Sequence, residues 1–412
     1  KKYVSTDVNE SMVFHRSIYF CDSSCLIMQI VCWLSSDLFG MTRRVVVGLS
    51  GGVDSAVSAL ILKKKGYDVI GVHMMNWDGM EEGTSSCPRT KDELDARVVA
   101  DRLSIPFYSI NFVKEYWNEV FTKMVDGYSR GKTIVPDINC NSKIKFHHLH
   151  SFALERLSAD FIATGHYAST SRGDFNDGTT NDGKCRLLRG RDSLKDQTYF
   201  LCTLKQEQLR RAIFPLGSMT KNQVKNMAFE NGLIEASRRK ESMGVCFVGK
   251  KKDFGKFLEE YIEGRCGSII DFKSGEKIGD HCGVHNFTVG KRLSVGSKSH
   301  LGYFVQRIDG DNGIVYAVES STHPSLYSTK FTVQTPEWIV DSPSKDSSLL
   351  CRVQRSHSPI HCFISIDGSL TTVIPSRPLR AICPGQMCVF YRDRECMGGG
   401  EVLSINATLK TQ

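Results

Sequence analysis

Hydrophobic and polar residues alternate along the first half of the chain in blocks that predict strands separated by helices. Apolar, β-branched runs predict the strands, and apolar residues spaced three and four apart predict the helices. The predicted strands are 44–49, 68–75, 107–112 and 161–164. The predicted helices are 53–65, 92–103, 113–128 and 146–157. This order favours a doubly wound α/β fold, in which helices cover both faces of a parallel sheet.

The pattern changes further along the chain. A stretch rich in Gly, Asp, Asn and Ser at 170–184 predicts a surface loop, and helical periodicity returns at 205–213 and 221–231. Beyond about residue 269, short β-rich runs predict small all-β domains, the last of them a β-barrel. These runs are 314–318, 329–333, 349–353, 362–366, 381 onward and 388–391. We therefore expect an appended segment at 1–40, an α/β domain at 41–246, a central β-rich domain at 247–325 and a C-terminal barrel at 326–412.

The loop after the first predicted strand carries a phosphate-binding pattern. Residues 45–55 read VVVGLSGGVDS, which predicts a buried strand, a loop rich in glycine and serine, and then a helix. Glycines let backbone N–H groups approach a ligand, and a helix N-terminus adds partial positive charge. The Walker pattern GxxxxGK[ST] is absent. The loop is predicted to cradle a pyrophosphate group, and the alternative is a strand-to-helix turn without a ligand.

Composition narrows the class of protein further. The chain of 412 residues is 41% hydrophobic and 24% charged, as in ordinary soluble proteins, and its net charge of +8 suits an anionic partner such as RNA. Its 15 cysteines include no CxxC pair, which argues against a disulfide framework and against a zinc ribbon. The apolar run at 25–34 is too short to cross a bilayer. Residues 1–40 hold four acidic residues and one arginine, a poor match to a mitochondrial presequence, so we expect a divergent targeting segment or upstream sequence.

Two cysteines stand in suggestive surroundings. Cys140 follows Asp137 by three residues in a predicted loop, so a single turn can aim both side chains at one point. Nearby Lys143 and Lys145 favour the thiolate form of Cys140, although a small packing residue explains it equally well. Cys246 lies between a glycine-containing loop and an apolar patch, where a packing role alone would be the better interpretation.

Taken together, the motifs resemble the tRNA-specific 2-thiouridylases, bacterial MnmA and its mitochondrial counterpart. The resemblance runs from about residue 44 to about residue 402, and its ESMG sequence at 241–244 looks closer to the mitochondrial branch. The motifs are SGGVDSAV, GVHMMNWD, KEYWNEVF, PDINCNSKIKF, ATGHYA, LLRGRDSLKDQTYFL, ESMGVCFVGK, and PGQ near MGGGE. The resemblance implies that the α/β domain is a PP-loop ATP pyrophosphatase, adenine nucleotide alpha hydrolase-like, and that the protein is mitochondrial.

The resemblance also implies a reaction, the ATP-dependent 2-thiolation of the wobble uridine of tRNA. ATP with Mg²⁺ would adenylate O2 of the uridine and release pyrophosphate, after which sulfur replaces the activated oxygen and AMP leaves. Cys246 matches the cysteine that carries the sulfur as a persulfide, and Cys140 matches its partner. A Cys140–Cys246 disulfide would then remain to be reduced in each cycle. Asp137 matches a residue placed to act as general base or to orient the uracil.

The binding residues implied by the resemblance form two groups. The ATP-binding positions are Gly48, Leu49, Ser50, Gly51, Gly52, Val53, Asp54, Ser55, Met74 and Gly165. The tRNA-binding positions are Val135, Pro136, Asp137, His166, Lys195, Asp196, Gln197, Arg355 and Gln386. The family usually has asparagine where Val135 stands, and an aromatic residue is common at the position of Ser356. The implied partners are tRNAs for lysine, glutamate and glutamine and an upstream persulfide donor, with no membrane.

Three other interpretations remain open. Another PP-loop adenylating ligase, such as a tRNA lysidine synthetase, would need no paired cysteines. A non-catalytic tRNA-binding sulfur carrier would accept sulfur without consuming ATP. An iron–sulfur cluster held by Asp137, Cys140 and Cys246 could take the place of the persulfide. We favour the persulfide because only two cysteines converge. Cys87 also aligns with the family, but the sequence assigns it no role.

Overall fold

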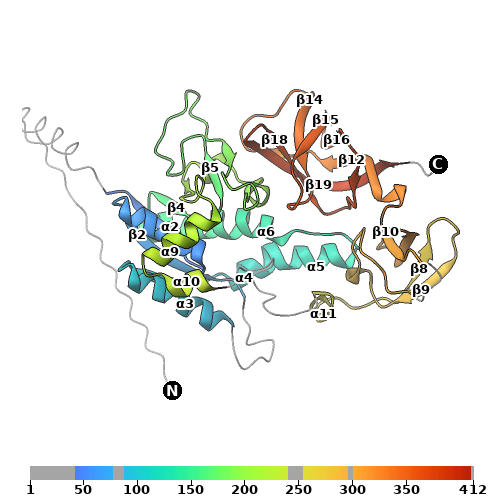
Figure 1. The fold of residues 1–412 in the computed structure, drawn as a ribbon, viewed down its shortest axis with the longest axis horizontal. Helices are drawn as coiled ribbons and strands as arrows, with labels where there is room; N and C mark the ends of the chain where they lie inside the picture. The colour runs from blue at the N-terminus through green and yellow to red at the C-terminus, as the bar shows by residue number, and fades with distance from the viewer. Residues whose placement is uncertain (1–41, 78–87, 240–253, 296–299, 410–412) are drawn as a thin grey trace, which may run out of the picture. The chain divides into compact units, whose positions relative to one another are not determined.

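The computed structural model describes residues 42–77, 88–239, 254–295 and 300–409. The expected segment at 1–40 lies outside these residues. The first part of the chain forms a five-stranded parallel sheet in the order β3-β2-β1-β4-β7 (Figure 1). Its strands are β1 (Arg44–Gly48), β2 (Asp68–Met75), β3 (Phe107–Asn111), β4 (Phe161–Ala163) and β7 (Ala212–Ile213).

Both faces of this sheet are covered, which confirms the predicted doubly wound fold. Along β1, Val45 and Val47 pack into one hydrophobic core and Val46 into the other, because successive side chains of a strand point to opposite faces. The helices on the Val45 side are α2 (Val53–Lys64), α3 (Pro88–Arg102), α9 (Lys221–Glu230) and α10 (Ile234–Arg238). Those on the Val46 side are α4 (Val113–Tyr116), η1 (Trp117–Phe121), α5 (Thr122–Ser129), α6 (Pro136–Asn139), η2 (Cys140–Leu149) and α7 (His150–Leu157).

Two expected elements of the α/β part were wrong. The predicted helix at 205–213 is a single turn, α8 (Gln206–Leu209), followed by strand β7, whose Ala212 pairs with Ile162 of β4. A short buried apolar run fits a strand as well as a helix, so periodicity alone did not separate them. The predicted loop at 136–141 is helical, since α6 begins with Pro136 in its first turn, where a missing N–H costs nothing.

The C-terminal part is a closed six-stranded β-barrel, as the sequence predicted. Each strand pairs with the next in antiparallel fashion, and pairing between the first and last strands closes the barrel. In spatial order the strands are β12 (Tyr327–Gln334), β16 (Leu370–Pro375), β15 (Ile360–Asp367), β14 (Asp346–Arg352), β18 (Met387–Arg392) and β19 (Glu395–Thr408). The predicted strand from 381 onward is wrong, because β17 (Leu379–Arg380) ends before Ala381, which turns the chain with φ +58°. Two residues of β13 (Glu337–Trp338) pair with β19.

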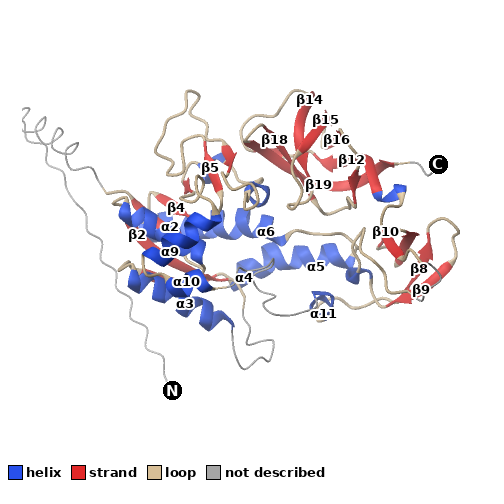
Figure 2. Cartoon of the chain, viewed as in Figure 1, coloured by secondary structure: helices blue, strands red, loops and turns tan. Residues whose placement is uncertain are grey.

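The stretch of chain between these two parts forms a four-stranded sheet with its own small core (Figure 2). Its order is β10-β11-β8-β9, formed by β8 (Gly267–Asp271), β9 (Lys277–His281), β10 (Tyr303–Asp309) and β11 (Ile314–Glu319). The short helices around it are α11 (Phe254–Glu259), η4 (Val284–Asn286) and η5 (Pro324–Leu326). Within the described ranges, no helix has the length and apolar character needed to cross a membrane.

Backbone pairing joins the α/β part to the barrel. The hairpin of β5 (Ala168–Thr170) and β6 (Leu187–Arg189) follows the parallel sheet, and β6 pairs with the start of β19. The barrel sheet therefore continues into the α/β part of the chain. The 3₁₀ turn η3 (Thr198–Leu201) follows this hairpin, and its Tyr199 hydroxyl donates to the backbone carbonyls of Val353 and Met387 in the barrel.

A buried ion-pair network lies at the same junction. The Asp196 carboxylate is fully buried, 3.1 Å from the guanidinium of Arg352 of the barrel and 3.4 Å from that of Arg189 of β6. It also accepts hydrogen bonds from the backbone N–H and the hydroxyl of Thr198. Four donors thus surround one carboxylate, which is the arrangement that makes a buried charge tolerable.

We predict that Asp196→Ala lowers the free energy of unfolding by about 3–5 kcal/mol, because it leaves the buried Arg352 guanidinium without its carboxylate. Urea titration of the whole protein measures the change. The matched control is Asp341→Ala, which breaks an exposed pair with Lys184 and should cost less than about 1 kcal/mol. Equal losses in the two variants would contradict the importance of the buried network.

Candidate active site

The predicted phosphate loop is tightly held by its own serines. The Ser55 hydroxyl donates to the Gly52 carbonyl at 3.0 Å and accepts from the Ser50 backbone N–H at 3.2 Å. Gly51 has φ +73°, and a Cβ there would lie 2.7 Å from the Asp95 side chain, so the turn requires glycine. The loop delivers the chain from the carboxyl end of β1 into the N-terminus of α2, the setting that binds anions in other proteins.

The other predicted ATP positions meet this loop from the neighbouring strands. Met74 is near the end of β2, and its methyl lies 3.6 Å from where a Cβ of Gly48 would be. Gly165 follows β4, and a Cβ there would lie 2.8 Å from backbone atoms of both Asp54 and Ser55. Because β2, β1 and β4 are adjacent, the structure brings the predicted ATP-binding positions together at one edge of the sheet.

Three residues that the sequence analysis missed hold this edge in place. The Asp54 carboxylate accepts from the Lys221 ammonium and from the Tyr167 hydroxyl, each at 2.8 Å. The Arg239 guanidinium bonds the Ser50 carbonyl at 3.3 Å and pairs with acidic residues of α3. In the sequence these residues stand among ordinary polar neighbours, and Lys221 is far from Asp54 along the chain, so no local signal identifies them.

The candidate chemical residues Asp137 and Cys140 lie on the continuous helix formed by α6 and η2. Residues three apart on a helix share a face, so the two side chains are neighbours, as the spacing suggested. The Cys140 side chain is buried, with 6% of its surface exposed. Its predicted partner Cys246 and the aligned Cys87 lie outside the described residues, so the structure does not place the cysteine pair.

Burial and the charge of Lys145 shift the pKa values of Asp137 on α6 and of His166 in the loop after β4. Burial raises the pKa of Asp137, and the Lys145 ammonium opposes this rise. Burial, reinforced by the same Lys145 charge, holds the pKa of His166 well below its usual value, so this imidazole is neutral at physiological pH. Its Nδ1 lies 2.7 Å from the Thr164 hydroxyl. The His166 ring centroid lies 6.1 Å from that of Phe146 on η2, so the helix that carries Asp137 and Cys140 packs beside the loop that holds Gly165.

The predicted tRNA-binding segment 195–197 lies next to His166 and the barrel. The Gln197 amide oxygen accepts from the Tyr167 backbone N–H at 3.0 Å, and Arg355 of the barrel donates to the Leu194 carbonyl at 3.2 Å. The structure thus brings Lys195, Gln197 and Arg355 close together, whereas the Asp196 side chain is enclosed in the buried network. An enclosed carboxylate offers no surface to a ligand in this conformation.

Of the remaining predicted tRNA-binding positions, Val135 lines a pocket, and Pro136 and Gln386 are next to lining residues in the chain. The barrel turn at Gln386 docks on the segment before Val135, where Pro384 O accepts from Thr133 N at 2.9 Å. The Gln386 side chain is buried, and its amide oxygen accepts from the Cys383 backbone N–H. Beside this contact is a pocket of about 330 Å³. Its lining residues come from α5, from the start of α6 and from the barrel, and include Lys123, Arg130, Lys132, Val135, Asn139, Met387 and Glu401.

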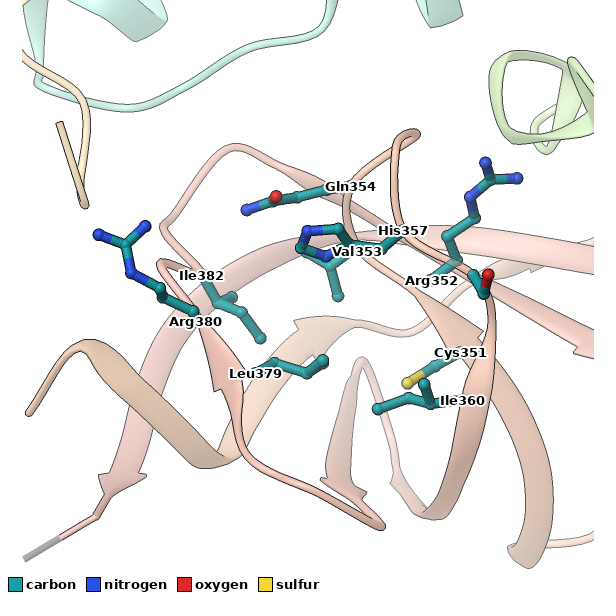
Figure 3. A pocket seen from close by; sticks show the side chains of 10 residues that line it. Cys351, Arg352, Val353, Gln354, His357, Ile360, Leu379, Arg380 and Ile382 are labelled. Carbon is teal, nitrogen blue, oxygen red and sulfur yellow. The ribbon is translucent and has the colours of Figure 1, made fainter. Parts of the chain in front are cut away.

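Figure 3 shows a much smaller cavity at one end of the barrel. Its volume is about 10 Å³, which holds about one water molecule and no nucleotide. Arg352 and Arg380 extend away from each other, with Gln354 and His357 between them (Figure 3). This cavity is therefore no candidate for the catalytic site.

Three family models match consecutive parts of the chain. The tRNA methyl transferase HUP domain matches residues 43–250, the tRNA methyl transferase PRC-barrel domain matches 255–319, and the Aminomethyltransferase beta-barrel domain matches 328–402. These ranges correspond in order to the parallel sheet, the central sheet and the six-stranded barrel.

Named relatives match over nearly the same length. The probable mitochondrial tRNA-specific 2-thiouridylase 1 of Caenorhabditis elegans is 55% identical over 374 residues, 89% of this chain and 100% of that protein. The tRNA-specific 2-thiouridylase MnmA of Enterococcus faecalis is 42% identical over 364 residues, 87% of this chain and 94% of that protein. A solved 4-thiouridine synthetase–RNA complex with bound ATP matches at 19% identity and TM-score 0.31, over 52% of this chain and 46% of that chain, too low to bear on function. By its family models and these relatives, the chain belongs to the tRNA-specific 2-thiouridylase family.

Proposed function

We propose that this protein replaces O2 of the wobble uridine of tRNA with sulfur at the expense of ATP, releasing AMP and pyrophosphate. The observation that carries the proposal is the Gly165–His166 dipeptide. Gly165 packs against the start of α2, and the His166 ring lies 6.1 Å from that of Phe146, on the helix that also carries Asp137 and Cys140. The nucleotide cradle and the candidate chemical helix therefore meet at one place.

The first half-reaction activates the uracil oxygen. The 48–55 loop and the N-terminus of α2 hold the phosphates, while Met74 and Gly165 border the adenosine. Asp137 accepts the N3 proton as O2 attacks the α-phosphorus, and pyrophosphate departs. Mg²⁺ bound to the phosphates of ATP would neutralise part of their charge.

The second half-reaction transfers sulfur. A persulfide on Cys246 either attacks C2 directly or yields hydrosulfide when the Cys140 thiolate attacks its inner sulfur. In the direct route the terminal sulfur displaces AMP from C2, and the Cys140 thiolate then attacks Cys246 Sγ and releases the sulfur on the uracil. In the other route the freed hydrosulfide displaces AMP from C2. Both routes leave a Cys140–Cys246 disulfide, which an external dithiol reduces with two electrons. The sulfur itself comes from an upstream persulfide donor.

We also propose the partners and the compartment. The net charge of +8 and the grouping of Lys195, Gln197 and Arg355 suit the anticodon arm of tRNA, and the mitochondrial branch suggests tRNAs for lysine, glutamate and glutamine. The similarity to the nematode relative, together with the ESMG motif, supports a mitochondrial location.

The central test is an anaerobic thiolation assay with a labelled sulfur donor, ATP–Mg²⁺ and unmodified tRNA. Cys140→Ser and Cys246→Ser should each reduce sulfur incorporation at least about a thousandfold, because the transfer needs both thiols. Cys185→Ser is the matched control, a buried thiol that bonds the Leu209 carbonyl and should keep its activity. AMP formation that survives both active-site changes would favour another PP-loop ligase, and activity that rises with iron content would favour a cluster.

Asp137→Asn should separate activity from stability. Burial raises the folded-state pKa of Asp137 above its unfolded value, so its contribution to stability is full at low pH and is lost as pH rises through the folded pKa. At pH 7 the ionised carboxylate therefore costs stability. The asparagine variant should lose about a hundredfold or more in kcat while its melting temperature stays equal or rises. A lower melting temperature would contradict the buried-base assignment.

Lys145→Met should move the pH profile of the reaction. The Lys145 charge holds down the pKa of Asp137, so its removal lets that pKa rise further. The acid limb of kcat/KM should then shift to higher pH, since the base is protonated over a wider range. Lys143→Met, two residues earlier on the same helix, serves as the control. An acid limb that does not move in Lys145→Met would show that Asp137 is not the group that limits the rate at low pH.

A further inference from the structure

Two side chains, those of Tyr167 and Lys221, bond the carboxylate of Asp54, the second residue of α2. Both carboxylate oxygens of Asp54 lie 2.8 Å from the Lys221 ammonium, and one of them also accepts the Tyr167 hydroxyl at 2.8 Å. The three residues come from separate elements, since Asp54 lies in α2, Tyr167 follows β4 and Lys221 begins α9. The ammonium also faces the Tyr167 ring at 5.8 Å.

Lys221 is held in this position by its surroundings. It is only 7% exposed, which is unusual for a lysine. Its backbone N–H bonds the Asp192 carboxylate at 3.0 Å, and the preceding Thr220 caps α9 together with Gln223. A buried ammonium is stable only beside a compensating charge, and Asp54 supplies that charge.

The Asp54–Lys221 pair also reduces electrostatic repulsion in the proposed phosphate site. A carboxylate one residue inside the N-terminus of α2 stands where the phosphates of ATP are proposed to bind, and like charges repel strongly in a partly dry site. Neutralisation of Asp54 by Lys221 removes this repulsion. The Gly165 backbone packs directly against Asp54 and Ser55, so the carboxylate cannot swing away on that side.

We propose that Lys221 is a positioning residue of the nucleotide site, which fixes the Asp54 carboxylate and cancels its charge so that the polyphosphate can bind. This inference rests on the proposed use of ATP, but it assigns a role that neither the phosphate-loop motif nor the paired cysteines require. It predicts that the loss of Lys221 harms nucleotide binding through the charge left on Asp54.

A double-mutant cycle that removes each charge tests the inference. It measures equilibrium binding of ATP to the whole protein in EDTA, which removes divalent cations. Lys221→Met should weaken binding at least about tenfold, because Asp54 is left as an uncompensated anion. Asp54→Asn should bind this metal-free ATP as tightly as the unchanged protein or more tightly. The double variant Asp54→Asn/Lys221→Met should recover most of the loss. Lys225→Met, one turn further along α9, is the matched control and should bind normally.

The outcomes separate the two proposals. If the unchanged protein binds ATP neither in EDTA nor with Mg²⁺, the proposed function fails, and this inference fails with it. Binding that appears only with Mg²⁺ overturns this inference alone, because the cation and not Lys221 would then compensate Asp54. If the unchanged protein binds ATP and Lys221→Met binds equally well, only the inference is overturned. A loss in Lys221→Met that Asp54→Asn does not restore would show that Lys221 acts by packing rather than by charge. Circular dichroism of each variant checks that the fold is retained, and Lys221→Arg should restore binding because it keeps the charge.

Discussion

The buried carboxylate of Asp196 is the interaction on which the arrangement of the α/β part and the barrel depends. Two arginines from different parts of the chain converge on it, and neither could be enclosed at this junction without an anion between them. The Tyr199 hydrogen bond to Val353 and the pairing of β6 with β19 join the two parts at the same junction. One result is that Arg355, three residues beyond Arg352, is held over the 194–197 segment.

At the 48–55 loop too, charged side chains from distant parts of the chain balance one another. A loop of small residues brings backbone dipoles together, and bulky side chains are excluded by direct contact at Gly51 and Gly165. Charge is then balanced from outside the loop by Lys221 and Arg239. Binding of an anion at such a place depends as much on these distant cations as on the motif itself.

Local sequence was enough for some features and not for others. The phosphate loop and the parallel sheet could be predicted because their signals lie within short windows of sequence. The family could be predicted because its motifs recur in order from about residue 44 to about residue 402. The helical start at 136–141 was missed because its proline and polar residues look like a loop, and β7 was missed because two apolar residues carry no period. The Asp54–Lys221 and Asp196–Arg352 pairs join distant positions, so only the fold reveals them. Asp196 illustrates the limit, since family position suggested a tRNA contact and the structure encloses its side chain.

The hairpin of β5 and β6 has a consequence for the newly made chain. Leu188 pairs with Glu395, so the hairpin emerges from the ribosome long before its partner strand exists. At roughly 5–20 residues per second, the edge of β6 waits for about ten seconds or more with its backbone groups unpaired. An edge strand in that state is a template for pairing with other chains. Until the barrel is complete, the free edge of β6 therefore leaves the new chain open to pairing with other chains.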